Sequence, residues 1–297
     1  GESPAMFQTF DDESDASQGA QRVAALRNWL EAHELDGFVV PRSDEHQGEY
    51  VAPCSERLKW LTGFTGSAGV AVVLRSRAVL FVDGRYTLQA KQQVDPAVFS
   101  IDSLITNPPS EWLKTNASSG MRIGLDPWLH TMAEVKALRA SAAKAGAEIV
   151  TLDTNPIDAI WEDRPEPPAG AIVIQPLAFA GELAKDKLAS AAETIAAEPA
   201  THAVLTDPSS LTWIFNIRGS DVPHTPLALG FAILAADGSH AIYMDERKLD
   251  IEAKAYLTQL AAIRPPEALA ADLAALAEAG ATVMLDPVLA AERLRML

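Results

Sequence analysis

The chain has 297 residues, a length typical of two domains of ordinary size. Apolar residues make up 48% of it and charged residues 22%, a balance that supports packed cores and excludes global disorder. Its 40 acidic and 24 basic residues give a net charge of −16, which repels phosphate backbones and disfavours nucleic-acid binding. The longest apolar stretch, residues 227–236, is too short to span a bilayer.

The cysteine content and the N-terminal sequence bear on where the protein works. A single cysteine, Cys54, allows neither an internal disulfide nor a thiolate metal cluster, which is typical of a reducing compartment. Residues 1–17 are polar and acidic, without the apolar segment of a secretory leader. We therefore expect a cytoplasmic protein whose residues 1–17 are a disordered or tag-derived tail, with Met6 as a candidate native start.

Apolar periodicity predicts the elements of the first half. Val23, Leu26 and Leu30 recur at helical spacing, which predicts a helix over residues 21–34. Two apolar runs separated by a short polar segment predict a hairpin. The other expected elements are a strand at 38–40, the hairpin strands at 70–74 and 78–82, a helix at 87–94, a strand at 122–125, a helix at 132–145 that stops at Gly146, and a strand at 148–152.

A proline-rich segment separates the two halves. Residues 155–168 contain four prolines among charged residues, and prolines break both helices and strand pairing. We therefore predict a linker here, with one helical turn at 157–161. The alternation of strands and helices resumes after it, which is typical of α/β domains with mixed sheets. The expected domains are residues 18–154 and 169–297.

The two halves resemble each other at fixed offsets. The matching blocks are residues 58–61 with 211–214, 66–67 with 219–220, 80–83 with 242–245, and 125–129 with 285–289. Chance reuse of common turn residues is the alternative, but the shared order and spacing favour a true repeat. In the first copy a helix and a strand follow the last block, whereas too few residues follow Leu289 to form both. We therefore predict that the second domain is truncated and that the chain is a piece of a longer protein.

The first copy contains a polar insertion, at about residues 44–55, that the second copy lacks. Because the repeat does not need this insertion, it is a candidate for contact with a substrate or a neighbouring domain. Asp44, Glu45 and His46 within it could hold an ion. Neighbouring residues on one turn rarely converge on a metal, however, and none of the six histidines has the spacing of a metal motif. We interpret the three residues as a solvated turn.

Other reactive groups have simpler structural explanations. The run around Ser67 lacks the first glycine of a nucleophile elbow and the Lys-Ser/Thr ending of a phosphate-binding loop. We interpret the glycines of residues 63–69 as a tight turn with positive φ. Cys54 has no basic neighbour before Arg57, so we predict a packed thiol and not a reactive thiolate.

Arg85 is the strongest candidate for contact with a ligand. It follows an apolar strand, in the turn Asp83-Gly84-Arg85-Tyr86. A guanidinium at a strand end can bind a carboxylate or peptide carbonyls with two nitrogens. It can equally form an internal ion pair with Asp83 or another acid, and residue chemistry alone leaves both roles open.

Several segments together resemble the cytosolic type of Xaa-Pro aminopeptidase, of the creatinase/aminopeptidase pita-bread metallopeptidase family. The segments that carry the resemblance are residues 44–54, 63–69, 83–90, 160–165 and 213–222. Three-domain members of this family have two related creatinase-type N-terminal domains before a C-terminal catalytic domain. The resemblance implies that the chain is the first two domains, each a mixed α/β sheet with flanking helices and a ribonuclease H-like motif. The pita-bread catalytic domain would be absent.

The resemblance also implies the chemistry. The absent catalytic domain would hold two divalent metals, usually manganese, on two Asp, one His and two Glu. No metal ligand, cofactor site or catalytic residue is therefore expected in this chain. The family's Arg of Asp-Gly-Arg-Tyr reaches toward the bound peptide and matches Arg85, with His46 and Tyr86 as weaker candidates for substrate contact. The parent enzyme is expected to be a cytoplasmic homodimer that acts on proline-containing peptides, with no membrane or nucleic-acid partner.

These observations leave three hypotheses for function. The first is the non-catalytic N-terminal region of a metallo-aminopeptidase that removes the first residue of Xaa-Pro peptides. This region would shape substrate access and domain packing, and it would be inactive alone. The second is a stand-alone module that binds peptides or a partner without catalysis. The third is a fragment of a creatinase-type small-molecule hydrolase, which the tandem copies disfavour.

Overall fold

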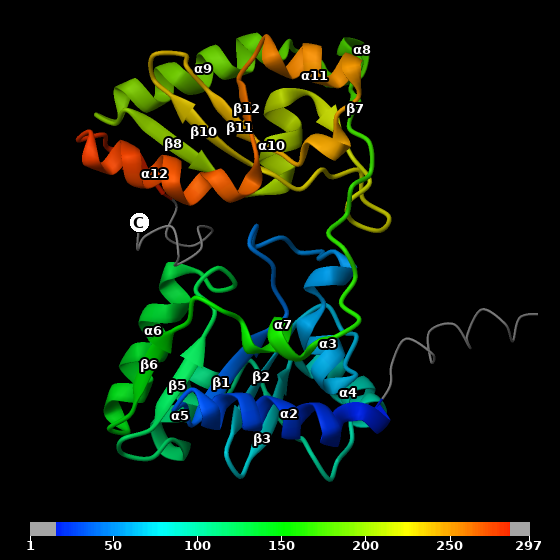
Figure 1. The fold of residues 1–297 in the computed structure, drawn as a ribbon, viewed down its shortest axis with the longest axis vertical. Coiled ribbons are helices and arrows are strands. Elements are labelled where there is room, and N and C mark those ends of the chain that lie inside the picture. The colour runs from blue at the N-terminus through cyan, green and yellow to red at the C-terminus, as the bar shows by residue number, and fades with distance from the viewer. Residues whose placement is uncertain (1–15, 286–297) are drawn as a thin grey trace, which may run out of the picture. The chain divides into compact units, whose positions relative to one another are not determined.

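The computed structural model describes residues 16–285, so the predicted tail at residues 1–17 lies almost entirely outside the described part. Contacts along the chain divide the described residues into two compact units (Figure 1). The first unit holds residues 16–43 and 53–166, and the second holds residues 44–52 and 167–285. Most of the predicted insertion thus interrupts the first unit in sequence but groups with the second unit by its contacts.

The first unit is built on a six-stranded mixed sheet with the strand order β4-β3-β2-β1-β5-β6. Strand β2 runs antiparallel to β1 and β3, and the pairs β1–β5, β3–β4 and β5–β6 are parallel. The strands are β1 (Gly37–Pro41), β2 (Gly69–Leu74), β3 (Ala78–Val82), β4 (Ser100–Ser103), β5 (Arg122–Leu125) and β6 (Glu148–Thr151). The predicted hairpin is confirmed, whereas β4 is an additional strand that its polar sequence does not predict.

Helices cover both faces of this sheet. Phe38 and Val40 of β1 lie in a core with helix α2, and Val39 lies in the opposite core with α5 and α6. Strands buried on both faces have continuous apolar sequences, which is the pattern of β1, β2 and β3. The helices of this unit are α2 (Gly19–Ala32), α3 (Arg57–Thr62), α4 (Thr87–Gln93), α5 (Pro109–Asn116), α6 (Met132–Lys144) and α7 (Pro156–Ile160).

The structure differs from the prediction within the proline-rich segment. Asn155 caps α7 by accepting a hydrogen bond from the Ile157 backbone N–H at 2.9 Å. Pro156 occupies the first helical turn, where a missing N–H costs nothing. Ile157 and Trp161 are one turn apart and both are buried in the core that contains α2. Residues 155–161 therefore pack as part of the first unit, because two apolar side chains at this spacing form one helical face.

The second unit repeats this topology. Its sheet has the order β12-β11-β10-β8-β13, in which β10 is antiparallel to β8 and β11, and the pairs β11–β12 and β8–β13 are parallel. The first five positions of the first sheet, β4-β3-β2-β1-β5, have the same order and directions. The strands are β8 (His202–Leu205), β10 (Phe231–Ala235), β11 (Ala241–Tyr243), β12 (Ala262–Arg264) and β13 (Val283–Met284). The sequence repeat is thus a repeat of fold, and the predicted missing helix and strand fall outside the described residues.

The core of the second unit lies on the face that α9, α10 and α11 cover. Leu188 of α9, Leu211 of α10 and Leu257 of α11 pack there against Ile242 of β11. Strands β7 and β9 form a separate two-stranded antiparallel sheet. The remaining bounds are α8 (Leu177–Ala180), α9 (Ala184–Ala197), α10 (Pro208–Phe215), α11 (Ile251–Thr258), α12 (Leu269–Glu278), β7 (Val173–Ile174) and β9 (Ile217–Arg218).

The glycines of residues 63–69 act in two different ways. Gly63 ends α3 with a φ of 85°, the left-handed conformation that glycine adopts without strain. Gly66 and Gly69 do not have positive φ, contrary to the prediction for this run. A Cβ at Gly66 would lie 2.2 Å from Cζ of the buried Phe64 ring. Gly66 is therefore present because the aromatic ring needs the space.

We predict that Gly66→Ala lowers the free energy of unfolding by about 1–3 kcal/mol, the usual cost of overpacking a core. Urea denaturation of the two proteins measures the difference. Gly84→Ala is the matched control, because a Cβ there meets nothing within 4 Å, and it should cause no loss. Equal stability of the Gly66→Ala variant and the parent would show that the Phe64 ring does not need the space.

Candidate functional site

The predicted contact residue Arg85 lies in a one-turn helix, η3 (Gly84–Tyr86), directly after β3. The Asp83 carboxylate caps this turn by accepting a hydrogen bond from the Arg85 backbone N–H at 3.0 Å. It also accepts one from Arg85 Nε at 3.3 Å. The backbone N–H and then the guanidinium of Arg85 hold the pKa of Asp83 below its usual value. The internal ion pair that the sequence left open is therefore present, through one nitrogen.

The rest of the Arg85 guanidinium remains available. Its side chain is 72% exposed, and within residues 16–285 its two terminal nitrogens have no protein hydrogen-bond partner. Tyr86 lies beneath it, with the Arg85 Cζ 5.3 Å from the ring centre. The Tyr86 hydroxyl shares a hydrogen bond with Ser67, and its ring meets Phe64 edge to face. A fixed aromatic ring thus supports a cation whose free nitrogens can bind a carboxylate or a carbonyl.

The second unit contains a matching turn that sequence reasoning missed. In η4 (Glu246–Lys248), after β11, the Asp245 carboxylate accepts from the Arg247 backbone N–H at 2.9 Å, as Asp83 does from Arg85. Here the guanidinium donates through both Nε, at 3.0 Å, and Nη2, at 2.7 Å. These bonds hold the pKa of Asp245 below its usual value. Both bonds hold the Arg247 guanidinium on the Asp245 carboxylate. The sequence match between Asp83 and Asp245 is the signal from which this second turn could be predicted.

His46, the weaker candidate in the insertion, is not in a solvated turn. Its ring is stacked on Phe231 of the second unit with centroids 4.3 Å apart, and only 8% of the residue is exposed. Asp44 is 1% exposed and accepts hydrogen bonds from the backbone N–H groups of His46 and Gly48. The interpretation as a solvated turn is therefore wrong, because the stacking partner is distant in sequence. Arg85 and Tyr86 are in contact with each other, whereas His46 belongs to a separate cluster.

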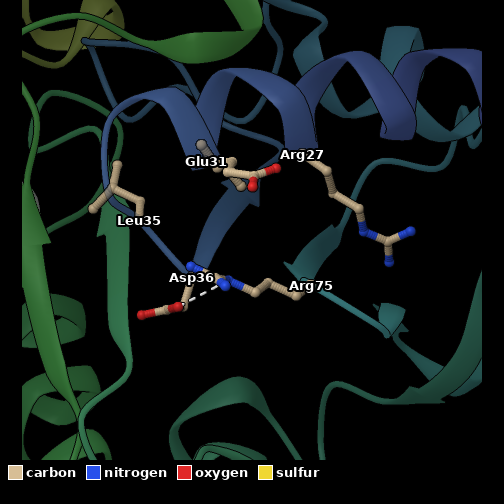
Figure 2. A pocket seen from close by; sticks show the side chains of 6 residues that line it. Arg27, Glu31, Leu35, Asp36 and Arg75 are labelled. Atoms are coloured by element: carbon tan, nitrogen blue, oxygen red, sulfur yellow. Dashed lines mark ion pairs between the residues drawn. The ribbon is translucent and has the colours of Figure 1, made fainter.

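A small cavity of about 150 Å³ lies beside α2 in the first unit (Figure 2). Arg75 Nε binds Asp36 at 2.9 Å, and Asp36 also accepts from the backbone N–H of Arg122. Arg27 donates to the carbonyl of Leu74, and partial burial lowers its pKa. The remaining lining residues are Leu30, Glu31 and Leu35. Its two guanidinium groups are matched by two carboxylates, so the cavity selects neither an anion nor a cation.

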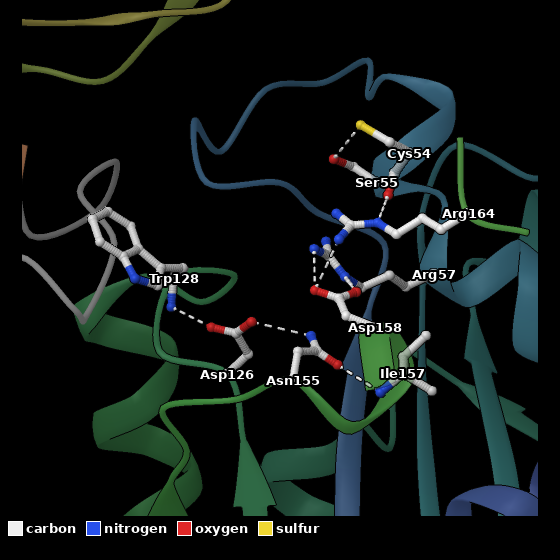
Figure 3. Close-up of polar contacts among 9 residues, drawn as sticks. All are labelled: Cys54, Ser55, Arg57, Asp126, Trp128, Asn155, Ile157, Asp158 and Arg164. Carbon is white, nitrogen blue, oxygen red and sulfur yellow. Dashed lines mark hydrogen bonds and ion pairs between the residues drawn. The ribbon is translucent and has the colours of Figure 1, made fainter. Parts of the chain in front are cut away.

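A buried polar network ties α3 to the segment around α7 (Figure 3). Arg57 is 2% exposed and binds both carboxylate oxygens of Asp158, at 2.7 and 3.1 Å. Arg164 binds the same carboxylate at 3.2 Å and donates to the carbonyl of Cys54 at 2.8 Å. Cys54 itself is buried, which confirms the packed thiol. The network ties α3 to α7 within the first unit, and each charged side chain in it has an ionic partner that explains its position.

Two family matches cover almost the whole chain. Residues 22–160 match a family described as the Creatinase/Prolidase N-terminal domain, and residues 163–296 match a second family with the same description. The chain belongs to the creatinase/prolidase N-terminal domain family. It contains two such domains in tandem, and the first and second units described above are these two creatinase-type domains. The resemblance drawn from the sequence is confirmed at the level of the family and the fold.

The relatives of these domains are aminopeptidases. The chain is 35% identical over 263 residues to a protein of Aspergillus clavatus named "Probable Xaa-Pro aminopeptidase P", and 33% identical over 283 residues to one of the same name from Neosartorya fischeri. These alignments cover 88% and 93% of the chain but 40% and 43% of the relatives. The chain therefore spans less than half the length of the curated relatives it matches.

A solved structure shows the same fold. The chain matches the crystal structure of X-prolyl aminopeptidase from Caenorhabditis elegans, described as a cytosolic enzyme with a di-nuclear active site, with a TM-score of 0.86 and 26% sequence identity. The match covers 94% of this chain and 48% of that one. Within residues 16–285 of the two creatinase-type domains, no three His, Cys, Asp or Glu side chains gather closely enough to hold a metal ion. No helix in this described range has the length and apolarity to cross a membrane.

Asp44 gives the insertion a pH-dependent stability. Burial raises the pKa of its carboxyl above the ordinary value of 3.8. The unfolded chain therefore ionises this group at a lower pH than the folded chain does. As the pH rises from about 3.8 through the raised pKa, the unfolded chain binds fewer protons and the Asp44 contribution to stability falls.

We predict that Asp44→Asn removes this loss, because the amide oxygen can still accept the two backbone hydrogen bonds. Urea unfolding of both proteins across this pH range should show the variant gaining on the parent as the pH rises. Asp83→Asn is the control of opposite sign, since the pKa of Asp83 is lowered and its contribution grows as the pH rises. Parallel pH profiles for the parent and Asp44→Asn would contradict the assignment.

Proposed function

We propose that the chain is the N-terminal, non-catalytic region of a metallo-aminopeptidase that removes the first residue from Xaa-Pro peptides. The observation that carries this proposal is the pairing of two facts. Two tandem creatinase-type domains fill the chain, and the aligned relatives named Xaa-Pro aminopeptidase P are more than twice as long. In this proposal the two domains shape the access of peptides and pack against a catalytic part that the relatives contain and this chain does not.

The metal chemistry of such an enzyme has no place in the described residues. The Caenorhabditis elegans enzyme has a di-nuclear active site by its description, but residues 16–285 of this chain offer no matching donor set. We therefore assign two divalent metals, manganese by family resemblance, to the catalytic part outside the chain and derive no step through them. A cytoplasmic location and a homodimeric parent enzyme belong to the same proposal, and the cytosolic description of that relative supports the location.

Arg85 is the residue through which these domains would touch a peptide. Its free guanidinium nitrogens lie above a ring that Ser67 and Phe64 hold in place. A planar guanidinium can bind a peptide carboxylate or carbonyl with two parallel hydrogen bonds. Proline removes the backbone N–H at its own position in a peptide, so recognition there depends on carbonyl oxygens, which a guanidinium can bind. Arg247, held by two bonds from its guanidinium to Asp245, lacks this freedom.

The first prediction of this proposal is that the 297-residue chain does not release the first residue of Xaa-Pro peptides, with or without added manganese. The longer protein from the natural reading frame is the positive control and should be active in the same buffer. Turnover by the short chain would overturn the non-catalytic assignment. A reading frame that stops at Leu297 would instead favour the stand-alone binding module.

The second prediction compares the two matching arginines in the longer protein. Arg85→Ala should lower kcat/KM for Xaa-Pro peptides by about tenfold to a hundredfold, the loss of a charge-assisted hydrogen bond of 1.5–3 kcal/mol. Arg247→Ala is the matched control and should leave kcat/KM within twofold of the parent, about 0.4 kcal/mol. Metal content, measured by mass spectrometry, should be unchanged in both. Equal effects of the two substitutions would return Arg85 to a structural role.

A further inference from the structure

The two creatinase-type domains share a cation–tryptophan pair that no sequence motif reveals. In the first domain Arg22 of α2 donates to the carbonyl of Trp60, and its guanidinium lies 4.6 Å from the Trp60 ring centre. In the second domain Lys187 of α9 donates to the carbonyl of Trp213 at 2.8 Å, and its amine lies 4.4 Å from that ring. Each cation is the fourth residue of its helix. The same pairing of a helix cation with a tryptophan ring and carbonyl is therefore present in both domains.

In the first domain, another part of the chain covers the tryptophan of this pair. Trp161, directly after α7, stacks on Trp60 with ring centroids 5.7 Å apart and is itself 8% exposed. Helix α7 contacts both α2 and α3 (Figure 1). Its Ile157 is fully buried. The segment that follows the last strand of the first domain thus covers Trp60 and contacts both α2 and α3.

In the second domain, no segment of the described residues covers the matching surface of α9 and α10 in this way. Trp213 is 58% exposed, and Leu183, which precedes α9, is 43% exposed. The sequence repeat pairs Asp126 with Asp286, and α7 begins farther after Asp126 than the chain continues after Asp286. A counterpart of α7 would therefore belong to residues beyond Leu297.

The exposed Trp213 lies against a buried, hydrogen-bonded lysine. Lys187 is 4% exposed, and its amine donates to Asn216 Oδ1 at 2.6 Å as well as to the Trp213 carbonyl. Asn216 in turn donates to the carbonyl of Glu182 at 2.7 Å, which fixes the start of α9 against the end of α10. An exposed aromatic ring that rests on a cation, with its backbone fixed by hydrogen bonds, has less entropy to lose on binding than an unsupported one, and such residues are typical of binding hot spots.

We propose that the surface of α9 and α10 around Trp213 is the docking site for a short helix from the chain segment that follows the second domain in the longer protein. The chemistry of the occupant is that of residues 155–161: a capped, proline-started turn with apolar or aromatic side chains one turn apart. The inference rests on the proposed function in one respect, namely that the protein continues beyond Leu297.

Hydroxyl-radical footprinting of the 297-residue chain and of the longer protein tests the inference. Oxidation of Trp213, quantified by mass spectrometry, should be fast in the short chain and several-fold slower in the longer protein, close to the rate of the buried Trp161. Trp161 should be slow in both. The occupant is identified by placing a photo-crosslinking phenylalanine derivative at Leu183 of the longer protein. The cross-linked peptide should come from the residues immediately after the second domain, and a peptide from elsewhere would overturn the proposal.

Two substitutions provide an independent measurement in the same proteins. Trp213→Ala should shift the melting temperature of the short chain little and lower that of the longer protein by several degrees, whereas Trp60→Ala should lower both. Trp213→Phe should retain most of the stability of the longer protein. If Trp213→Ala shifted the melting temperature equally in the two proteins, the proposal that a segment of the longer protein covers Trp213 would be wrong.

The possible failures are distinguishable. A longer protein that trims Xaa-Pro peptides while Trp213 oxidises as fast as in the short chain overturns this inference alone. A longer protein that protects Trp213 but has no aminopeptidase activity supports the inference and overturns the proposed function. If the protection of Trp213 in the short chain grows with protein concentration, a second copy of the chain occupies this surface. That result overturns the inference. A reading frame that ends at Leu297 overturns both.

Discussion

The sheet of the first creatinase-type domain is apolar on both faces, and the rest of that domain follows from the need to cover it. Exposing apolar surface costs about 25 cal/mol per Å², so each face must carry its own layer of helices. Helices α2 and α3 with α7 cover one face, and α5 and α6 cover the other. Helix α7 is therefore the final element, in chain order, that contributes to the core of this domain. The prolines around it shape its start and end without marking the edge of the domain.

Duplication has preserved the packing of these domains and let their surface groups diverge. The turns after β3 and β11, which occupy the same place in the two sheets, are both capped by an aspartate, Asp83 or Asp245, that binds the arginine two residues later. In the second domain the carboxylate takes two guanidinium nitrogens, whereas in the first it takes one. The backbone geometry is common, but of these two turns in the described residues only the first leaves both terminal guanidinium nitrogens without a protein hydrogen bond. A repeated fold thus does not require the same surface chemistry in both copies.

Sequence reasoning located the elements whose signal is local. The strands at 78–82 and 122–125 match β3 and β5 to the residue. For β3 the reason is a continuous apolar run, which marks its own ends. The positions that it missed depend on distant partners. His46 is buried because Phe231 stacks on it, and residues 155–161 are packed because Trp161 meets Trp60. The Arg22 and Lys187 pairs escaped detection because the insertion shifts the register of the repeat between these helices and their tryptophans.

The surface around Trp60 and the surface around Trp213 differ in one contact that affects how firmly each can hold a helix. In the first domain the buried Arg57 of α3 binds both oxygens of the partly exposed Asp158 in α7, and this ion pair reinforces the aromatic contact. Removing Asp158 would leave the Arg57 charge buried without it, which is destabilising, so the pair fixes α7 in place. The repeat puts Ser210 at the position of Arg57, and Ser210 is bonded to Asp207 in its own helix cap. A helix docked on the second domain would therefore depend on the contact with Trp213, a closure without the ionic lock of the first.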